Sequence, residues 1–216
     1  MQFEKILNNG VLYNIFQRVI KNKKGINSYK NYFSHSHNLP NKNIIKVLDI
    51  GCGHGTSVPY LYHTDYTGID INEGNIILAK RKYVNFPNMN FIAGNVSEYI
   101  LSGKLLENTF DIVFMNGVLH HLSREIINSI LSQIPKLIKE NGVFQSIDPV
   151  YTKNQPKISK WLMSHDRGKY ILELDEYLML LKDYFPVLKY KIETDLFRFP
   201  FPYPLIQSWG YLCDKE

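Results

Sequence analysis

The feature that most constrains the fold of this chain is an apolar strand pattern that ends on three alternating glycines. Residues 44–50 (IIKVLDI) form a run rich in β-branched residues, as expected for a short strand with both faces covered. The run leads directly into residues 51–55 (GCGHG). Glycines there permit positive φ angles and let the backbone approach a ligand closely. The pattern therefore predicts a strand, a ligand-binding loop and then a helix.

Further strand and helix patterns alternate along the chain after this loop. Strands are predicted at 66–70, 90–93, 111–115 and 142–147, with helices at 73–83 and 123–140. Ser123 is expected to cap the second helix, Pro135 to kink or split it, and Asn141-Gly142 to end it. Strands that alternate with helices predict a doubly wound α/β fold with a parallel sheet and right-handed crossovers.

The two ends of the chain depart from this alternation. Residues 3–20 predict one or two helices, and 21–43 predict a polar loop. Within that loop, His35 and His37 have no Cys or carboxylate partner at metal-ligand spacing. Residues 151–185 are predicted to be helical and irregular, with Trp161, Tyr170 and Tyr177 in the core, and two strands are predicted near 187–197 and 203–212. We therefore expect one domain, with a helical cap (1–43), a cofactor-binding core (44–150), a helical lid (151–185) and C-terminal strands (186–216).

Composition narrows the class of protein. Of the 216 residues, 44% are hydrophobic and 21% are charged, which is typical of a soluble globular protein. The net charge of +5 comes from scattered lysines and favours a solvated surface over a nucleic-acid patch. Cys52 and Cys213 form no CxxC pair, no apolar stretch is long enough to span a membrane, and the N-terminus lacks a signal-peptide layout. These features predict a soluble cytoplasmic protein.

The acid that follows the glycine loop indicates the kind of ligand. Asp70 lies nineteen positions after Gly51, at the end of the next predicted strand, where a carboxylate can bind a ribose diol. A dinucleotide loop requires G-x-G-x-x-G, whereas here the third glycine is Gly55 and Thr56 follows it. This spacing disfavours a nicotinamide dinucleotide and favours a ligand that joins adenosine to an amino-acid tail. A simple tight turn between strand and helix is the alternative.

Taken together, these motifs resemble those of class I S-adenosylmethionine-dependent methyltransferases. Residues 47–55 match the first motif of that family, and Asp70 matches its ribose-binding acid. Residues 94–96 (GNV) stand where the family usually has Gly-Asp-Ala beside the adenine, and 110–122 and 137–143 resemble its fourth- and fifth-strand motifs. The resemblance covers roughly 44–150. It implies a seven-stranded, mostly parallel sheet with an antiparallel C-terminal hairpin strand, and S-adenosylmethionine as the cofactor.

The resemblance also implies a set of cofactor contacts. They are Asp49, Gly51, Cys52, Gly53, Asp70, Ile71, Asn95, Val96 and Asn116. Asn95 replaces the usual Asp, but its amide oxygen can still accept a hydrogen bond from the adenine amino group. The stretches 146–149 (SIDP) and 164–168 (SHDRG) are similar to small bacterial methyltransferases of polysaccharide and secondary-metabolite pathways. That similarity favours a small-molecule or glycan-type acceptor.

Methyl transfer to a hydroxyl requires a group that removes the proton. His120 and His121 follow the fourth strand, so one of the two rings should face the site. His120 is the preferred candidate, with His121 and Asp148 as alternatives, and a further alternative is that both histidines only contact the cofactor or shape the site. Asp148 could instead cap the turn at the following proline. His165, Asp166 and Arg167 are expected to bind the acceptor, unless the Asp and Arg pair with each other. Only one carboxylate, that of Asp148, lies on the acceptor side, so no metal is expected.

Two other functions compete with this reading. An RNA or protein methyltransferase is disfavoured by the modest charge and by Asn116-Gly117-Val118-Leu119 in place of an Asn/Asp-Pro-Pro-aromatic motif. A non-catalytic module that only binds the cofactor is disfavoured because Gly51, Gly53 and Asp70 are all present. The sequence does not indicate the oligomeric state.

Overall fold

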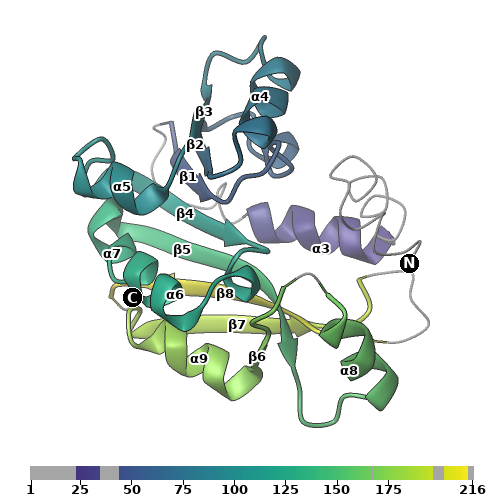
Figure 1. Ribbon diagram of the computed structural model, residues 1–216. Coiled ribbons are helices and arrows are strands. Elements are labelled where there is room, and N and C mark those ends of the chain that lie inside the picture. The colour runs from purple at the N-terminus through teal and green to yellow at the C-terminus, as the bar shows by residue number, and fades with distance from the viewer. Residues whose placement is uncertain (1–22, 35–43, 167, 197–201, 214–216) are drawn as a thin grey trace.

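The computed structural model describes residues 23–34, 44–166, 168–196 and 202–213 (Figure 1). The helices predicted at 3–20, the two histidines of the N-terminal loop and Arg167 lie outside the described residues. None of the described helices has the length and apolar character needed to cross a lipid bilayer.

Seven strands form one continuous sheet in the order β3-β2-β1-β4-β5-β8-β7, and the short β6 pairs with β5 beside it. The strands are β1 (Lys46–Ile50), β2 (Asp65–Asp70), β3 (Met89–Ala93), β4 (Phe110–Asn116), β5 (Ile138–Tyr151), β6 (Leu172–Glu173), β7 (Val187–Glu193) and β8 (Leu205–Tyr211). β1 to β5 are parallel, whereas β8 is antiparallel to both β5 and β7. The predicted fold class, with its antiparallel C-terminal hairpin strand, is confirmed.

Helices cover both faces of this sheet (Figure 1). They are α3 (Lys23–Ser34), η2 (Val58–Tyr60), α4 (Glu73–Lys82), α5 (Val96–Leu101), η3 (Leu119–His121), α6 (Arg124–Leu131), α7 (Ile134–Leu137), α8 (Lys157–Ser164) and α9 (Leu174–Lys182). Helices α5, α6, α7 and α9 pack on one face with Val113 and Phe144, and α3 and α4 pack on the other with Phe114 and Val143. Successive side chains along a strand thus pack into the two hydrophobic clusters on opposite faces of the sheet. Because both faces are buried, each strand is a continuous apolar run in the sequence.

The helix predicted over 123–140 is split before Pro135, as one of the two expected outcomes, and its second part ends earlier than expected. α6 ends at Leu131, Pro135 stands in the first turn of α7, and the chain turns into β5 at Ile138. Proline fits the first helical turn because its missing N–H would have no partner there. The buried Ile138 pairs with Phe110 of β4, so the sheet overrides the helical pattern, and Asn141-Gly142 lies within β5 rather than ending a helix.

The polar loop predicted over 21–43 is partly wrong, because it contains α3. Gly25, Ser28 and Tyr32 are spaced by three and four residues and form one buried stripe of this helix. Gly25, Ser28 and the asparagines of this helix have low helix propensity, which hid the pattern. Tertiary packing against the sheet supplies the stability that local propensity lacks.

The predicted lid divides into two parts. α9 belongs to the core, because Tyr177, Leu180 and Leu181 are buried against the sheet. Because α9 belongs to the core, the part of the predicted lid that can lie outside the core is residues 152–173, here called the outer segment. Trp161 and Tyr170 were predicted in the core, but 56% and 45% of their surfaces are exposed, since both lie on this outer segment.

Candidate active site

The glycine loop after β1 has the backbone geometry that only glycine adopts easily. Gly51 and Gly53 have φ angles of +73° and +57°. A Cβ atom at Gly51 would lie 2.5 Å from the Val118 side chain, so the loop packs closely against the segment after β4. A Cβ atom at Gly53 would meet nothing within 4 Å. The backbone at Gly53 therefore faces open space that a ligand can enter.

Asp70, at the end of β2, is attached to this loop. Its Oδ2 accepts a hydrogen bond of 2.8 Å from the Gly53 N–H, and its Oδ1 accepts one of 2.8 Å from the Asn72 N–H. Ile71 comes next in the chain, and 81% of its surface is exposed. The Asp70 carboxylate is thus fixed against the loop, and the exposed apolar side chain of Ile71 lies next to it in the chain. This pair of groups suits a sugar hydroxyl pair and an attached aromatic ring.

Two of the expected cofactor residues point beneath the loop. The buried Asp49 carboxylate accepts a 2.7 Å hydrogen bond from the Tyr66 hydroxyl, and burial raises the pKa of Asp49 to about 6. Cys52 is buried with its Sγ under Gly68, and burial raises the pKa of its thiol. Both side chains are therefore turned into the core, where they support the loop.

Asn95 and Val96 begin α5 at the end of β3. The Asn95 Oδ1 accepts a 3.0 Å hydrogen bond from the Ser97 N–H and so caps the helix. Val96 is buried in the core under α5. Asn95 itself is exposed at the same edge of the sheet as Asp70, where its remaining polar atoms can contact a ligand.

Asn116 ends β4, which lies next to β1 in the sheet. Its Oδ1 accepts a 2.9 Å hydrogen bond from the Tyr32 hydroxyl of α3. Its Nδ2 is buried and has no hydrogen-bond partner among the described residues. A buried donor without a hydrogen-bond partner destabilises the folded protein, unless a bound ligand provides the acceptor. Together with the open space at Gly53 and the exposed Ile71, this donor fits a bound S-adenosylmethionine.

His120 and Asp148 form a buried pair beside this region. The His120 Nδ1 lies 2.7 Å from the Asp148 Oδ1, which also accepts from the His120 backbone N–H at 3.3 Å. Burial raises the pKa of Asp148, and the hydrogen bonds from His120 oppose that rise. The carboxylate fixes the orientation of the ring and favours a proton on Nδ1, which leaves Nε2 as the acceptor.

The second oxygen of Asp148 continues a chain of buried hydroxyls. The Tyr177 hydroxyl donates to the Asp148 Oδ2 at 3.3 Å and lies 2.7 Å from the Ser146 Oγ. The Ser146 Oγ in turn lies 2.6 Å from the Ser208 Oγ of β8. Both oxygens of Asp148 are thus used inside the protein, which favours a positioning role over a cap of the proline turn.

The other ring nitrogen of His120 faces the outer segment. The His120 Nε2 lies 3.7 Å from the Asp166 Oδ1, and the Tyr203 hydroxyl donates to the Asp166 Oδ2 at 2.8 Å. A Cβ atom at Gly168 would lie 1.9 Å from the His120 ring, so this glycine covers it closely. His121 is exposed, with its ring centroid 4.0 Å from that of His120. His120 is therefore flanked at both ring nitrogens, by Asp148 and by Asp166.

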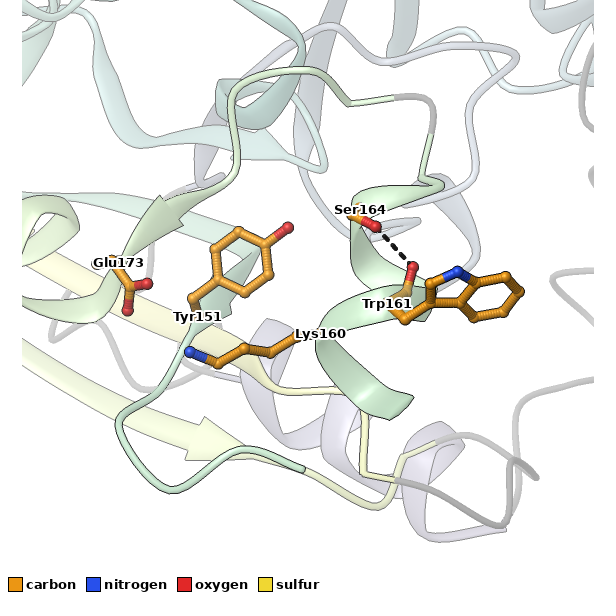
Figure 2. A pocket seen from close by; sticks show the side chains of 5 residues that line it. All are labelled: Tyr151, Lys160, Trp161, Ser164 and Glu173. Carbon is orange, nitrogen blue, oxygen red and sulfur yellow. Dashed lines mark hydrogen bonds between the residues drawn. The ribbon is translucent and has the colours of Figure 1, made fainter. Parts of the chain in front are cut away.

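An open pocket of about 350 Å³ lies on the same outer segment and is drawn in Figure 2. It is lined by Tyr151, Lys160, Trp161, Ser164 and Glu173. The Tyr151 ring enters it from the end of β5, whereas the Trp161 indole points away from Tyr151. Burial, Glu173 and Asp166 raise the pKa of Tyr151, so Asp166 lies within electrostatic range of this ring.

Of the expected acceptor residues, the structure describes His165 and Asp166, which follow Ser164 of this pocket and differ in their contacts. His165 follows α8, and its Nδ1 lies 2.8 Å from the Trp161 carbonyl oxygen. Asp166 faces His120, as described above. Among the described residues, no group of three or more His, Cys, Asp or Glu side chains is arranged to hold a metal ion.

Three residues of the site could not be identified from the sequence. Tyr32 fell in the predicted loop, although its spacing of three from Tyr29 was a helical signal. Tyr177 was read only as a core residue, because spacing does not show where a hydroxyl points. Lys160 joins the pocket through the tertiary position of α8, for which the sequence carries no signal.

Comparison with known proteins gives a family match. A family model described as "Methyltransferase domain" matches residues 41–182. An uncharacterised methyltransferase of Synechocystis sp. is 29% identical over 117 residues, which cover 52% of this chain and 53% of that protein. A fatty-acid O-methyltransferase of Mycolicibacterium smegmatis is 29% identical over 122 residues, which cover 54% of this chain and 40% of that protein. The chain thus matches about half or less of the length of these curated relatives.

A solved structure shares the fold. The structure of a SAM-dependent methyltransferase from Archaeoglobus fulgidus superposes with a TM-score of 0.65 and 19% identity. The superposition covers 86% of this chain and 90% of that one. At this level of identity the likeness establishes the arrangement of strands and helices.

Proposed function

Because this chain belongs to the methyltransferase domain family, we propose that it is an S-adenosylmethionine-dependent enzyme that methylates a hydroxyl group of a small-molecule or glycan-type acceptor. The observation that carries the proposal is the position of two sites at one edge of the sheet. The Gly51–Gly55 loop with Asp70 provides a cofactor site, and the Asp148–His120 pair provides a base. Val118 connects them, since it packs on Gly51 two residues before His120.

The cofactor would be held by groups from three neighbouring strands. Asp70 would bind the ribose hydroxyls, Ile71 would pack on the adenine, and Asn116 would donate its Nδ2 proton. When bound, S-adenosylmethionine supplies an electrophilic methyl group on a positively charged sulfur. The protein has to align the acceptor oxygen with that group and exclude water.

His120 is the group that takes the acceptor's proton in this proposal. Asp148 holds the Nδ1 proton in place, so Nε2 can accept a proton from a hydroxyl. The imidazolium that results is stabilised by the Asp148 carboxylate at 2.7 Å. Burial raises the pKa of Asp148, and the hydrogen bonds from His120 and, to a smaller extent, from Tyr177 act against that rise.

The outer segment 152–173 acts as a lid in this proposal. Asp166 and Gly168 cover His120, so an acceptor oxygen reaches Nε2 only after they move aside. The pocket of Figure 2 borders this cover and offers aromatic, hydroxyl and charged groups to a polar acceptor. Such a mixture suits a molecule with several hydroxyl groups better than a bare hydrocarbon.

The test is a methyl-transfer assay on separated fractions. Radiolabelled S-adenosylmethionine is supplied with the protein to a cell extract divided into small molecules, polysaccharides, RNA and protein. Label that enters the first two fractions and survives treatment with alkali, which hydrolyses carboxyl methyl esters but not methyl ethers, supports the proposal. Label confined to RNA or protein contradicts it. Tight binding of S-adenosylhomocysteine without any transfer would indicate a binding module.

A further inference from the structure

The strongest feature that the proposed reaction leaves unused is the hydroxyl of Tyr32 on α3. Tyr32 is buried and donates its hydrogen bond to the Asn116 Oδ1 at 2.9 Å. Burial raises the pKa of its phenol well above 10, so the hydroxyl stays protonated and remains a donor at physiological pH. It therefore has one clear effect, which is to fix the orientation of the Asn116 amide.

That orientation leaves the Asn116 Nδ2 without a partner. Nδ2 is buried and makes no hydrogen bond within the described part of the chain. If the amide turned by half a rotation, its oxygen would occupy the position of Nδ2 and the donor would be lost. Tyr32 opposes this turn, because its buried hydroxyl proton would then face an NH₂ group and lose the Oδ1 acceptor that it now has.

The ring of Tyr32 is itself held rigidly. Its centroid lies 5.2 Å from that of Phe33, 6.0 Å from Phe114 and 5.6 Å from Trp209. An aromatic cluster that spans α3, β4 and β8 thus packs around this phenol from several sides. The hydroxyl has little freedom to follow Asn116 if the amide moves.

α3 is in turn fastened to the sheet along its length. Lys24 donates to both carboxylate oxygens of Asp195, at 2.7 and 2.6 Å. Ser28 donates to Glu193 and accepts a 2.8 Å hydrogen bond from the Gln207 Nε2. These contacts position the helix on β7 and β8. Because Tyr32 lies on the same helix, they also fix where its hydroxyl meets Asn116 at the end of β4.

We propose that Tyr32 is a positioning residue that aims the Asn116 Nδ2 at the carboxylate of the cofactor's amino-acid tail. This inference rests on the proposed function. In the sheet, β1 and its glycine loop lie between β2, which carries Asp70, and β4, which carries Asn116. A cofactor whose ribose is bound at Asp70 extends across the loop toward Asn116. The tail carboxylate is its only anion, and a charge-assisted hydrogen bond favours it as the partner of Nδ2.

A double-mutant cycle tests the inference by titration calorimetry with S-adenosylhomocysteine. Tyr32→Phe should weaken binding about tenfold, since it removes the one bond that orients the amide. Asn116→Ala should weaken it by at least as much. The double variant should bind like Asn116→Ala alone, because Tyr32 acts only through the amide. Additive losses, or an unchanged Kd in Tyr32→Phe, would overturn the inference.

A second ligand and a matched variant sharpen the test. 5′-Methylthioadenosine lacks the amino-acid tail, so Tyr32→Phe should leave its Kd unchanged, and an equal loss for both ligands would contradict the role. Tyr60→Phe is the control: Tyr60 stacks on Phe33 with centroids 5.0 Å apart, and its hydroxyl makes no hydrogen bond among the described residues. It should bind both ligands normally. If the wild-type protein binds neither ligand, the proposed function itself fails.

Discussion

The imidazole of His120 lies between two carboxylates, with its Nδ1 2.7 Å from Asp148 and its Nε2 3.7 Å from Asp166. The two contacts differ in kind. Asp148 is fully buried on β5 and is also bound by Tyr177, whereas Asp166 is partly exposed on the outer segment. One carboxylate therefore belongs to the buried sheet, and the other to the outer segment that we propose as a lid.

Replacement of His120 should separate chemistry from cofactor binding. We expect His120→Ala to lower kcat by roughly 10²–10⁴-fold, because the acceptor proton loses its base. The Kd for S-adenosylhomocysteine should stay within about twofold, since the cofactor groups lie on β1, β2 and β4. His63→Ala, at an exposed loop position, is the control. Near-normal turnover in His120→Ala would transfer the proton role to another group, or show that the acceptor needs no base.

The acid side of the pH–rate profile should depend on Tyr177. Its hydrogen bond lowers the pKa of Asp148, and ionised Asp148 is the form that orients His120. Tyr177→Phe removes that bond, so the pKa of Asp148 rises and activity should be lost at a higher pH as the solution is acidified. The measurement is kcat against pH for both proteins. If Tyr177→Phe changed kcat at every pH but left unchanged the pH at which activity falls on acidification, Tyr177 would only pack the core.

The buried carboxylate under the glycine loop should make stability depend on pH. Folding raises the pKa of Asp49 from 3.8 to about 6, so between these values the folded protein binds more protons than the unfolded chain. The free energy of unfolding should therefore fall as pH rises through this window, by about 3 kcal/mol in all. Asp49→Asn cannot ionise and should lack this loss.

Urea denaturation of wild type and Asp49→Asn at pH 3.5 and 7.5 measures the difference. Asp65→Asn, on the exposed start of β2, is the matched control and should follow the wild type. Parallel stability curves for wild type and Asp49→Asn would contradict the raised pKa.

Methyl transfer should not require a divalent metal. The proposed chemistry uses a nitrogen base, and Asp148 is already committed to His120 and Tyr177. Activity should survive dialysis against EDTA and should not rise when magnesium is added. Loss of activity on chelation, with recovery in magnesium, would show that oxygen ligands take part.

Much of the fold could be predicted because its determinants are local. The run that ends in Gly51 and the alternation of strands and helices identify the parallel sheet, since buried strands and glycine turns have distinct patterns. Where prediction failed, distant contacts decided the structure. Ile138 pairs with Phe110 instead of extending a helix, and α3 forms because Tyr32 and its neighbours are buried on the sheet.

The site shows the same division. Asp70 could be placed beside the loop from its spacing, because β1 and β2 are adjacent parallel strands. The pairing of His120 with Asp148, residues on different segments 28 positions apart, required the register of β4 and β5. Tyr177 and Tyr32 lie on helices, and the spacing of apolar residues does not predict how these helices are oriented on the sheet. Hydroxyl partners of this kind depend on tertiary geometry.

The bond between Asp70 and the glycine loop provides the most direct test of cofactor binding. Calorimetric titration should show that wild type binds S-adenosylhomocysteine and does not bind NAD. Asp70→Ala should weaken S-adenosylhomocysteine binding by about tenfold to a hundredfold, because it removes a charge-assisted contact to the ribose, and Asp65→Ala at the other end of β2 should bind normally. An unchanged Kd in Asp70→Ala, or preferential binding of NAD by the wild type, would contradict the proposed cofactor site.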